Sequence, residues 1–380
     1  MNFDLTEDQT LLKASIERFL EDHYDLEKRR RYLAEPGGFS AGNWRLLAEL
    51  GILALPFPAD DGGLDGSFTD LMVVMEAMGR GLLVEPFITT VVFAGGLLRR
   101  LAADPRRVDL AGRIIGGDLR LAVAHAERTG RFNLAHVATT ARRTSDGWTL
   151  DGQKTLVLHA ETADALLVLA RTSGATDATD GLSLFLVPAD TPGLGWRHYR
   201  TADGQSASEV DFHGTALPST ALLGPEGDAW VAFEDSVTET SLALCGEAIG
   251  LMSALFDATL DYVKTRNQFG QAIGAFQAVQ HRMADGYVGL EQSRGLLYKA
   301  VMTDSAEVGR AAWMRTVAGT KAFISEAGLK LGHEAIQLHG GMGTTDELVV
   351  SHLHKRMVMI ATLFGDAACQ IERYNALATA

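Results

Sequence analysis

The stretch of sequence that decides the fold is VTETSLALCGEAIGLMSALFDATLDYV, residues 237–263, which is followed directly by KTRNQFGQAIGAFQAVQHRMADGY, residues 264–287. Its first half predicts a helix, because apolar and small residues recur there at steps of three and four and form one face. That face is apolar apart from one threonine and one carboxylate, Glu247. A buried carboxylate is costly unless it is paired, neutralised or used, so Glu247 marks a candidate site.

The second half of the stretch predicts a loop and then a further helix that carries Gln277. The loop contains Arg266, Gln268 and Phe269 ahead of a glycine. A guanidinium pairs with phosphate oxygens through two parallel N–H donors. This loop is therefore a candidate for holding a phosphate-bearing ligand.

The length and composition indicate a globular protein with more than one domain. A chain of 380 residues exceeds what one simple core supports, so two or three domains are expected. The net charge of −14 argues against nucleic acid or an anionic membrane as the main partner. Cys245 and Cys369 are the only cysteines, and no Cys or His pair stands at ligand spacing beside carboxylates. We therefore expect neither a disulfide framework nor a metal site.

No segment of the sequence reads as a targeting or membrane element. The N-terminus, MNFDLTEDQTLL, lacks the basic-then-apolar layout of a signal peptide. The longest apolar run, FITTVVFAGGLL at 87–98, is too short to span a bilayer and predicts a buried helix. A cytoplasmic protein without membrane partners is the expectation.

Periodicity divides the chain into three parts. Residues 1–118 have helical spacing, and the first helix is expected to open at Thr6 with a capping box to Gln9. Residues 119–224 contain short β-rich runs separated by turn residues, which is typical of an antiparallel barrel or sandwich. Helical spacing returns over 225–380, with helices expected at 306–338 and from 348 to about 374. The predicted fold class is α+β, with a helical domain, a β domain and a helical bundle in that order.

This layout and several motifs resemble the acyl-CoA dehydrogenase family over nearly the whole chain. The motifs are LAELGILALPFPADDGG (47–63), DGQKTLVLHAETADALLVLART (151–172), LFLVPADTPGLGW (184–196), RNQFGQAIGAFQ (266–277) and QLHGGMG (337–343). The resemblance is to members described as small subunits or as acting on pimeloyl-type or steroid side-chain substrates. It implies FAD at a subunit interface, an acyl-CoA substrate, electron-transfer flavoprotein as electron acceptor, and a homotetramer or a heterotetramer with a related subunit.

The resemblance also implies roles for single residues. Arg266 matches the arginine that contacts the FAD pyrophosphate, Gln268 and Phe269 match residues at the adenosine end, and Gln277 matches a further FAD contact. Gln337, Gly340 and Gly341 match a turn whose missing side chains let the backbone approach the cofactor. Three positions depart from the family pattern at the isoalloxazine, since two threonines and a tryptophan are replaced by Ala126, Leu158 and Leu156.

The family's catalytic carboxylate is missing from its usual places. Most members carry a glutamate at the position of Phe364, and others carry it at the position of Thr240. Some members resembling this chain carry a small-small-Glu pattern, which Cys245–Glu247 matches, and use that glutamate. We therefore predict Glu247 as the base that removes the proton α to the thioester; the competing interpretation is a buried ion pair with a cation from another helix.

Other charged residues near these places are weaker candidates. Asp366 is a rival acid or a helix cap, and Glu239 is expected to face solvent. His352, His354, Lys355 and Arg356 form a basic run that either lies near an anionic ligand or faces solvent.

Three functions fit these residues. The first is an active FAD-dependent dehydrogenase that forms the 2-enoyl-CoA with Glu247 as base and the flavin N5 as hydride acceptor. The second is a partner-dependent subunit that contributes FAD contacts while a partner chain supplies the base. The third is a related flavin oxidase or monooxygenase. The sequence does not identify the acyl group.

Overall fold

The computed structural model describes residues 5–101, 104–303 and 305–378, and these form two compact units. The first unit comprises Met1–Arg30, Ser67–Leu83 and Ser241–Ala380, and the second comprises Arg31–Gly66 and Val84–Thr240. Along the chain, helices are followed by strands and then by helices, which confirms the predicted fold class. The expected boundaries after residues 118 and 224 fall in connections beside the strand region, and the division into three domains stays a prediction. Its outermost positions, 1–4 and 379–380, lie outside the described residues.

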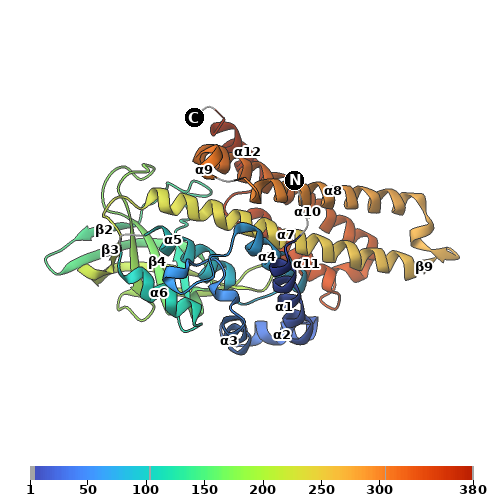
Figure 1. Ribbon diagram of the computed structural model, residues 1–380, viewed down its shortest axis with the longest axis horizontal. Coiled ribbons are helices and arrows are strands. Elements are labelled where there is room, and N and C mark those ends of the chain that lie inside the picture. The colour runs from blue at the N-terminus through green and yellow to red at the C-terminus, as the bar shows by residue number, and fades with distance from the viewer. Residues whose placement is uncertain (1–4, 102–103, 304, 379–380) are drawn as a thin grey trace. The chain divides into compact units, whose positions relative to one another are not determined.

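The first unit is a bundle of helices. Figure 1 shows the second half of α7 and α8 side by side, joined at their far end by the hairpin that contains β9. Helix α1 opens with the predicted capping box, in which the Thr6 hydroxyl accepts from the Gln9 amide and the Gln9 side chain accepts from the Thr6 amide. The helices of this unit are α1 (Glu7–His23), α4 (Phe68–Gly81), the part of α7 (Trp230–Thr265) from Ser241 onward, α8 (Gln277–Val301), α9 (Ser305–Val308), α10 (Arg310–His339), α11 (Val349–Thr362) and α12 (Ala367–Ala376).

Helix α7 is long and apolar enough to cross a membrane by length and composition alone. Of its most apolar 18-residue window, however, 78% is buried inside the protein. That degree of burial is typical of the core helix of a globular protein, and it explains why α7 is apolar on almost every side.

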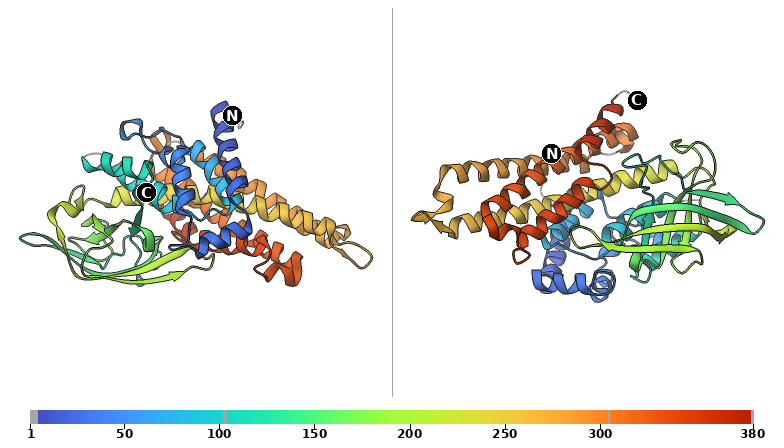
Figure 2. Two further views of the ribbon diagram at one scale, coloured as in Figure 1. Left: turned by 90° about the horizontal axis from the view of Figure 1, so that it is seen from below. Right: turned by 180° about the vertical axis from the view of Figure 1, so that it is seen from behind.

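The second unit is organised around a sheet of eight strands. Its order is β6-β7-β3-β2-β4-β5-β8, and β1 pairs with β4. Neighbours are antiparallel as predicted, except that β1 and β2 pair parallel with β4. Figure 2 shows the strands curving together in a twisted sheet. The strands are β1 (Leu121–Ala124), β2 (Thr140–Arg143), β3 (Gly147–Leu158), β4 (Ala165–Arg171), β5 (Leu182–Pro188), β6 (Leu194–Arg200), β7 (Ser206–Pro218) and β8 (Leu222–Leu223).

A hydrophobic core packs against the sheet of this unit, and every residue of β4 is buried, so this central strand is covered on both faces. Trp148 and Phe185 meet edge to face with ring centroids 5.2 Å apart inside that core. The apolar run at 87–98 forms the predicted buried helix, which opens as a π-helix over Phe87–Ala94 and continues as α5. The remaining helices are α2 (Leu26–Ala34), whose chain passes from one unit to the other, α3 (Ala41–Glu49), α5 (Gly95–Arg100) and α6 (Arg106–Ile115).

Two expected helices are interrupted. Gly309 adopts a φ of +85°, which separates α9 from α10 within the expected helix at 306–338. The expected last helix breaks between α11 and α12, where Phe364 has a φ of +58° and Gly365 a φ of +107°. An L-residue at positive φ cannot continue a right-handed helix, so the chain turns there and Asp366 starts α12.

Candidate active site

Glu247 lies where α4 and α7 cross at very short range. A Cβ added to Gly79 of α4 would overlap the Glu247 carbonyl oxygen and stand 2.8 Å from its carbonyl carbon. One turn further along α7, a Cβ on Gly250 would overlap the Glu76 carbonyl oxygen and stand 2.7 Å from the Arg80 nitrogen. Glycine is required at both positions, because only a missing side chain lets the two backbones approach so closely. The crossing therefore fixes the backbone that carries the Glu247 carboxylate.

The Glu247 carboxylate forms a two-pronged ion pair with Arg356 of α11. Arg356 Nε donates to Oε1 at 2.6 Å, and Arg356 Nη2 donates to Oε2 at 2.9 Å. Both side chains are 7% exposed. The structure thus contains the buried ion pair that was the competing interpretation of Glu247, and both carboxylate oxygens are engaged.

Arg356 belongs to a polar face of α11 that is buried, so the interpretation of the basic run as a solvent-facing surface is wrong for two of its members. His352, one turn before Arg356, is also buried. Its Nδ1 lies 3.5 Å from Arg29 Nη1, and its Nε2 lies 3.0 Å from the Asp346 carbonyl oxygen. A guanidinium only donates, so Nδ1 accepts and Nε2 carries the proton. Burial and the charge of Arg29 lower the pKa of His352, which fits this neutral form.

The other candidate acids are engaged elsewhere. Glu239 does not face solvent as expected: it is 3% exposed and forms ion pairs with Arg99 and, at 2.6 Å, with Arg100. Helical spacing gave the wrong answer because this part of α7 is buried on several sides. Asp366 caps α12, since its side chain accepts from the Cys369 amide at 2.9 Å. Of the two expectations for Asp366, rival acid or helix cap, the structure shows the helix cap.

A buried lysine supports the turn at Phe364, where the resemblance implies a catalytic glutamate in most members. Lys321 of α10 is 1% exposed and donates to the Ile360 carbonyl oxygen at 3.0 Å. It thereby satisfies a carbonyl near the C-terminus of α11, where a cation is favoured. The next turn is held by Gln370, whose side-chain amide donates to the Phe364 carbonyl oxygen at 2.7 Å. Burial lowers the pKa of Lys321 and raises that of the neighbouring Cys245 thiol to about 12, so Cys245 is a poor nucleophile.

The residues expected to contact FAD in the helical region lie on exposed turns of the first unit. Arg266 precedes the β9–β10 hairpin (Asn267–Gln268 and Gln271–Ala272), and among the described residues it has no ion-pair partner. Phe269, at the tip of this hairpin, is 91% exposed. Gln268 is also exposed, as is Gln277 at the start of α8. The guanidinium and the side-chain amides can donate to phosphate oxygens, and the exposed ring can stack on adenine.

The glycine turn lies at the same end of the bundle as the hairpin. Tyr262, near the end of α7, stacks on His339 with ring centroids 4.3 Å apart, and Gln337, Gly340 and Gly341 surround that histidine in the chain. Gly340 has a φ of +62°, and a Cβ at either glycine would meet nothing within 4 Å. The turn is therefore an open backbone surface that a cofactor can approach, which fits the expected role.

The positions expected to lie at the isoalloxazine belong to the second unit. The Thr155 amide donates to the Ala126 carbonyl oxygen at 2.8 Å, which places the end of β3 beside the segment after β1. The pairing of β3 with β7 shifts register between Lys154 and Val157, and Leu156 has a φ of +50°. Strained backbone of this kind is concentrated at ligand sites. With Ala126 and Leu158 in place of threonines, this segment offers backbone groups rather than hydroxyls.

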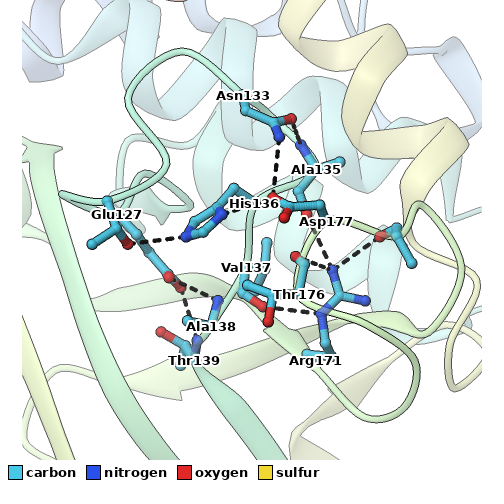
Figure 3. A network of polar contacts seen from close by, with 12 residues as sticks. Glu127, Asn133, Ala135, His136, Val137, Ala138, Thr139, Arg171, Thr176 and Asp177 are labelled. Carbon is cyan, nitrogen blue, oxygen red and sulfur yellow. Dashed lines mark hydrogen bonds and ion pairs between the residues drawn. The ribbon is translucent and has the colours of Figure 1, made fainter.

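Two buried ions hold the loops beside this segment, and neither was singled out from the sequence. The Glu127 carboxylate accepts from Lys154 Nζ at 2.8 Å and from the amides of Ala138 and Thr139. Arg171 donates to the carbonyl oxygens of Val137 and Ala135 and to four carbonyls of the loop after β4. Figure 3 shows its contacts with Val137 and Thr176. The contacts explain why loops rich in small polar residues are ordered here.

Arg356 and Lys321 are the residues that sequence reasoning missed at the candidate base. Arg356 carried a signal, because the sequence places a cation within a helix that also contains apolar residues at core spacing. Lys321 carried little, since a single lysine in a helix is usually exposed. A search for the cation that would balance a buried Glu247 could have found Arg356, but not Lys321, which donates to the Ile360 carbonyl oxygen.

Comparisons with known proteins match almost the whole length of the sequence. The sequence matches the descriptions "Acyl-CoA dehydrogenase, N-terminal domain" over residues 6–103, "middle domain" over 122–214 and "C-terminal domain" over 228–376. A solved structure of a variant of the "Tcur3481-Tcur3483 steroid ACAD" is 30% identical, with a TM-score of 0.86 and 98% of each chain covered.

Two further solved structures are similar over almost their whole length. One is the "FAD complex of PigA", which is 26% identical with a TM-score of 0.90, covering 100% of this chain and 99% of that one. The other is the ChsE4-ChsE5 complex from Mycobacterium tuberculosis, which is 26% identical with a TM-score of 0.86 and the same coverage.

Proposed function

Because this chain belongs to the acyl-CoA dehydrogenase family, we propose that it carries out FAD-dependent α,β-dehydrogenation of an acyl-CoA thioester with Glu247 as the base. The observation that carries the proposal is the position of Glu247, a buried carboxylate on the central helix of a chain whose usual base positions hold Phe364 and Thr240. The product is the corresponding 2-enoyl-CoA.

FAD is the cofactor of this family, and the residues of this chain fit it. Arg266, Gln268, Phe269 and Gln277 would hold its diphosphate and adenosine, and the open backbone of the Gln337–Gly341 turn would lie against it. The segment around Ala126 and Leu156 would receive the ring system through backbone groups. When bound, FAD supplies the acceptor for the hydride that leaves the β-carbon.

Glu247 would take the proton from the α-carbon. A base must be ionised before it can accept a proton, and the buried contact with Arg356 favours the ionised carboxylate. The close crossing at Gly79 and Gly250 holds the Glu247 backbone in place. The direction of the carboxylate then depends only on the side-chain torsions of Glu247. Burial of the pair also excludes water, which would otherwise compete for the carboxylate oxygens.

A second candidate function has a specific observation in its favour. Glu247 is bonded at both oxygens, Glu239 is paired with two arginines, and Asp366 caps a helix. In a partner-dependent subunit the related partner chain supplies the base, so all three of these carboxylates can be engaged with other groups. The ChsE4-ChsE5 complex among the similar structures is a two-component assembly by its name. Under this alternative the chain contributes FAD contacts and packing.

The partners follow from the same family assignment. We propose electron-transfer flavoprotein as the electron acceptor and a tetramer as the assembly, built either from this chain alone or with a related subunit. The exposed Phe269 hairpin supports an assembled state, because such a ring is stabilised when a second chain covers it. An acyl-CoA is the proposed substrate, and a cytoplasmic location stays a prediction from the sequence.

The decisive experiment compares E247Q with D257N. Asp257 is on the same helix but half exposed in a surface pair with Arg80, so D257N is a matched carboxylate-to-amide control. We expect E247Q to retain FAD, seen as its visible absorbance, and to lose nearly all flavin reduction by acyl-CoA. D257N should reduce its flavin at the rate of the unchanged protein.

Both variants are purified with any subunit that accompanies the chain. If E247Q reduces its flavin normally in such a complex, Glu247 is not the base and the partner-dependent function replaces the proposal. Circular dichroism and flavin content establish that each variant is folded before rates are compared.

A further inference from the structure

Glu247 and Arg356 form a bidentate ion pair, which proton abstraction by a carboxylate does not require. Each of the two carboxylate oxygens receives one N–H of the same guanidinium, at 2.6 and 2.9 Å. This geometry is the strongest that a side-chain ion pair adopts. Both oxygens of Glu247 are thereby occupied, so an incoming proton would have to displace a charged donor.

The two backbones that carry the pair are anchored independently of it. The glycine crossing with α4 fixes α7 at Glu247. On α11, His352 is held one turn before Arg356 by Arg29 and by the Asp346 carbonyl oxygen. Because each helix has contacts of its own at this place, we expect the pair to open by rotation of the two side chains.

We propose that Arg356 is a positioning residue that keeps Glu247 ionised and oriented in the resting site, and that it releases one carboxylate oxygen when the α-proton is taken. The second part rests on the proposed function, in which Glu247 is the base. The first part concerns only the two side chains and stands on the geometry of the pair.

The surroundings determine what happens when Arg356 is removed. On α11 the nearby titratable group is His352, which is neutral, and on α2 there is Arg29, which is engaged with His352. Lys321 of α10 is bonded to the Ile360 carbonyl, and Cys245 of α7 stays protonated. Glu76 of α4 lies 3.5 Å from Arg294.

These neighbouring groups are neutral or engaged with other partners, so the Glu247 carboxylate without Arg356 would be a buried charge that has lost its counter-ion. It would then take up a proton at a higher pH than the paired carboxylate does.

The test is the pH dependence of flavin reduction in R356M and R356K, with R80M as the matched control. Arg80 pairs with Asp257 on the surface of the same unit, and both side chains are 53% exposed. The rate should rise with pH as the base ionises, and we expect the midpoint of this rise to move up by about one pH unit or more in R356M, to move less in R356K and to stay unchanged in R80M. At high pH the limiting rate of R356M should equal or exceed that of the unchanged enzyme, because the base is no longer restrained.

Infrared spectroscopy gives a readout that needs no turnover. R356M should show the C=O stretch of a protonated carboxylic acid near neutral pH, and this band should be absent from the unchanged protein and from the E247Q/R356M double variant. If R356M folds poorly, the same band is sought in R356K.

The outcomes separate the two proposals. Midpoints and infrared bands identical to those of the unchanged protein in both Arg356 variants would overturn the positioning role, even if E247Q is inactive. A shifted infrared band together with normal flavin reduction in E247Q would keep Arg356 as the residue that ionises Glu247 and remove Glu247 from the reaction.

Discussion

The crossing of α4 and α7 predicts that Gly250 does not tolerate a methyl group. In a helix interior, Gly→Ala is usually stabilising by about 1 kcal/mol, because alanine has the better helix propensity. At Gly250, however, the new Cβ would overlap the Glu76 carbonyl oxygen and stand 2.7 Å from the Arg80 nitrogen, and both are backbone atoms of α4. Overpacking against a backbone that cannot rotate away costs about 1–3 kcal/mol. The gain is therefore cancelled or reversed.

Gly295 of α8 provides the control for this prediction. It also lies inside a helix of the first unit, but it is exposed and a Cβ there would meet nothing within 4 Å. G295A should gain only the stabilisation that comes from the better helix propensity of alanine. The difference in unfolding free energy between G295A and G250A therefore measures the cost of the overlap at Gly250, about 1–3 kcal/mol. Urea denaturation followed by circular dichroism measures both. If G250A is as stable as G295A, α4 and α7 do not approach as closely as described.

Two further predictions concern other parts of the site. Asp366→Ala should lower the unfolding free energy by about 1 kcal/mol in urea, D366N should lose less, and both should keep flavin reduction, because the carboxylate serves as a cap. His125, whose ring packs against Phe93 and Phe233, has its pKa lowered by burial from 6.5 to about 4. The unfolded chain therefore binds more protons in that window, so stability falls as pH drops from 6.5 towards 4, by up to about 1.4 kcal/mol per pH unit. Denaturation at a series of pH values should show that the unfolding free energy of H125Q falls less steeply as the pH drops. Equal slopes in H125Q and the unchanged protein would contradict the lowered pKa of His125.

Most of the fold was predictable from local signals. Strand β3 lies within the β-rich region expected at 119–224, and the Thr6 capping box forms as expected, because both depend on short-range patterns. Strand β6 was missed, since LGWRHYR follows a proline and glycine and its residues are mostly half-buried or exposed. Its place is fixed by antiparallel pairing with β7, the next strand along the chain, and not by an apolar pattern of its own.

The candidate site was predictable only in part. The sequence identified Glu247 as a buried acid, but its partner lies 109 residues away and no local pattern joins the two. Glu239 shows the opposite error. Its predicted exposure came from a helical wheel, whereas arginines on α5 enclose it. Burial of a charged side chain depends on which distant cations reach it, and spacing along one helix does not contain that information.

The contacts of Arg171 affect how well one loop of the second unit tolerates proteolysis and changes of sequence. Its guanidinium occupies the centre of the loop SGATDATDG, residues 173–181, where it takes the place that a bound metal ion fills in other loops. By composition this segment would be a natural site for protease cleavage and for insertions. Because the two terminal nitrogens of one planar guanidinium donate to four carbonyls of this loop, we expect the loop to resist both. A lysine at 171 has three donors on one atom and would leave several of these carbonyls without a partner.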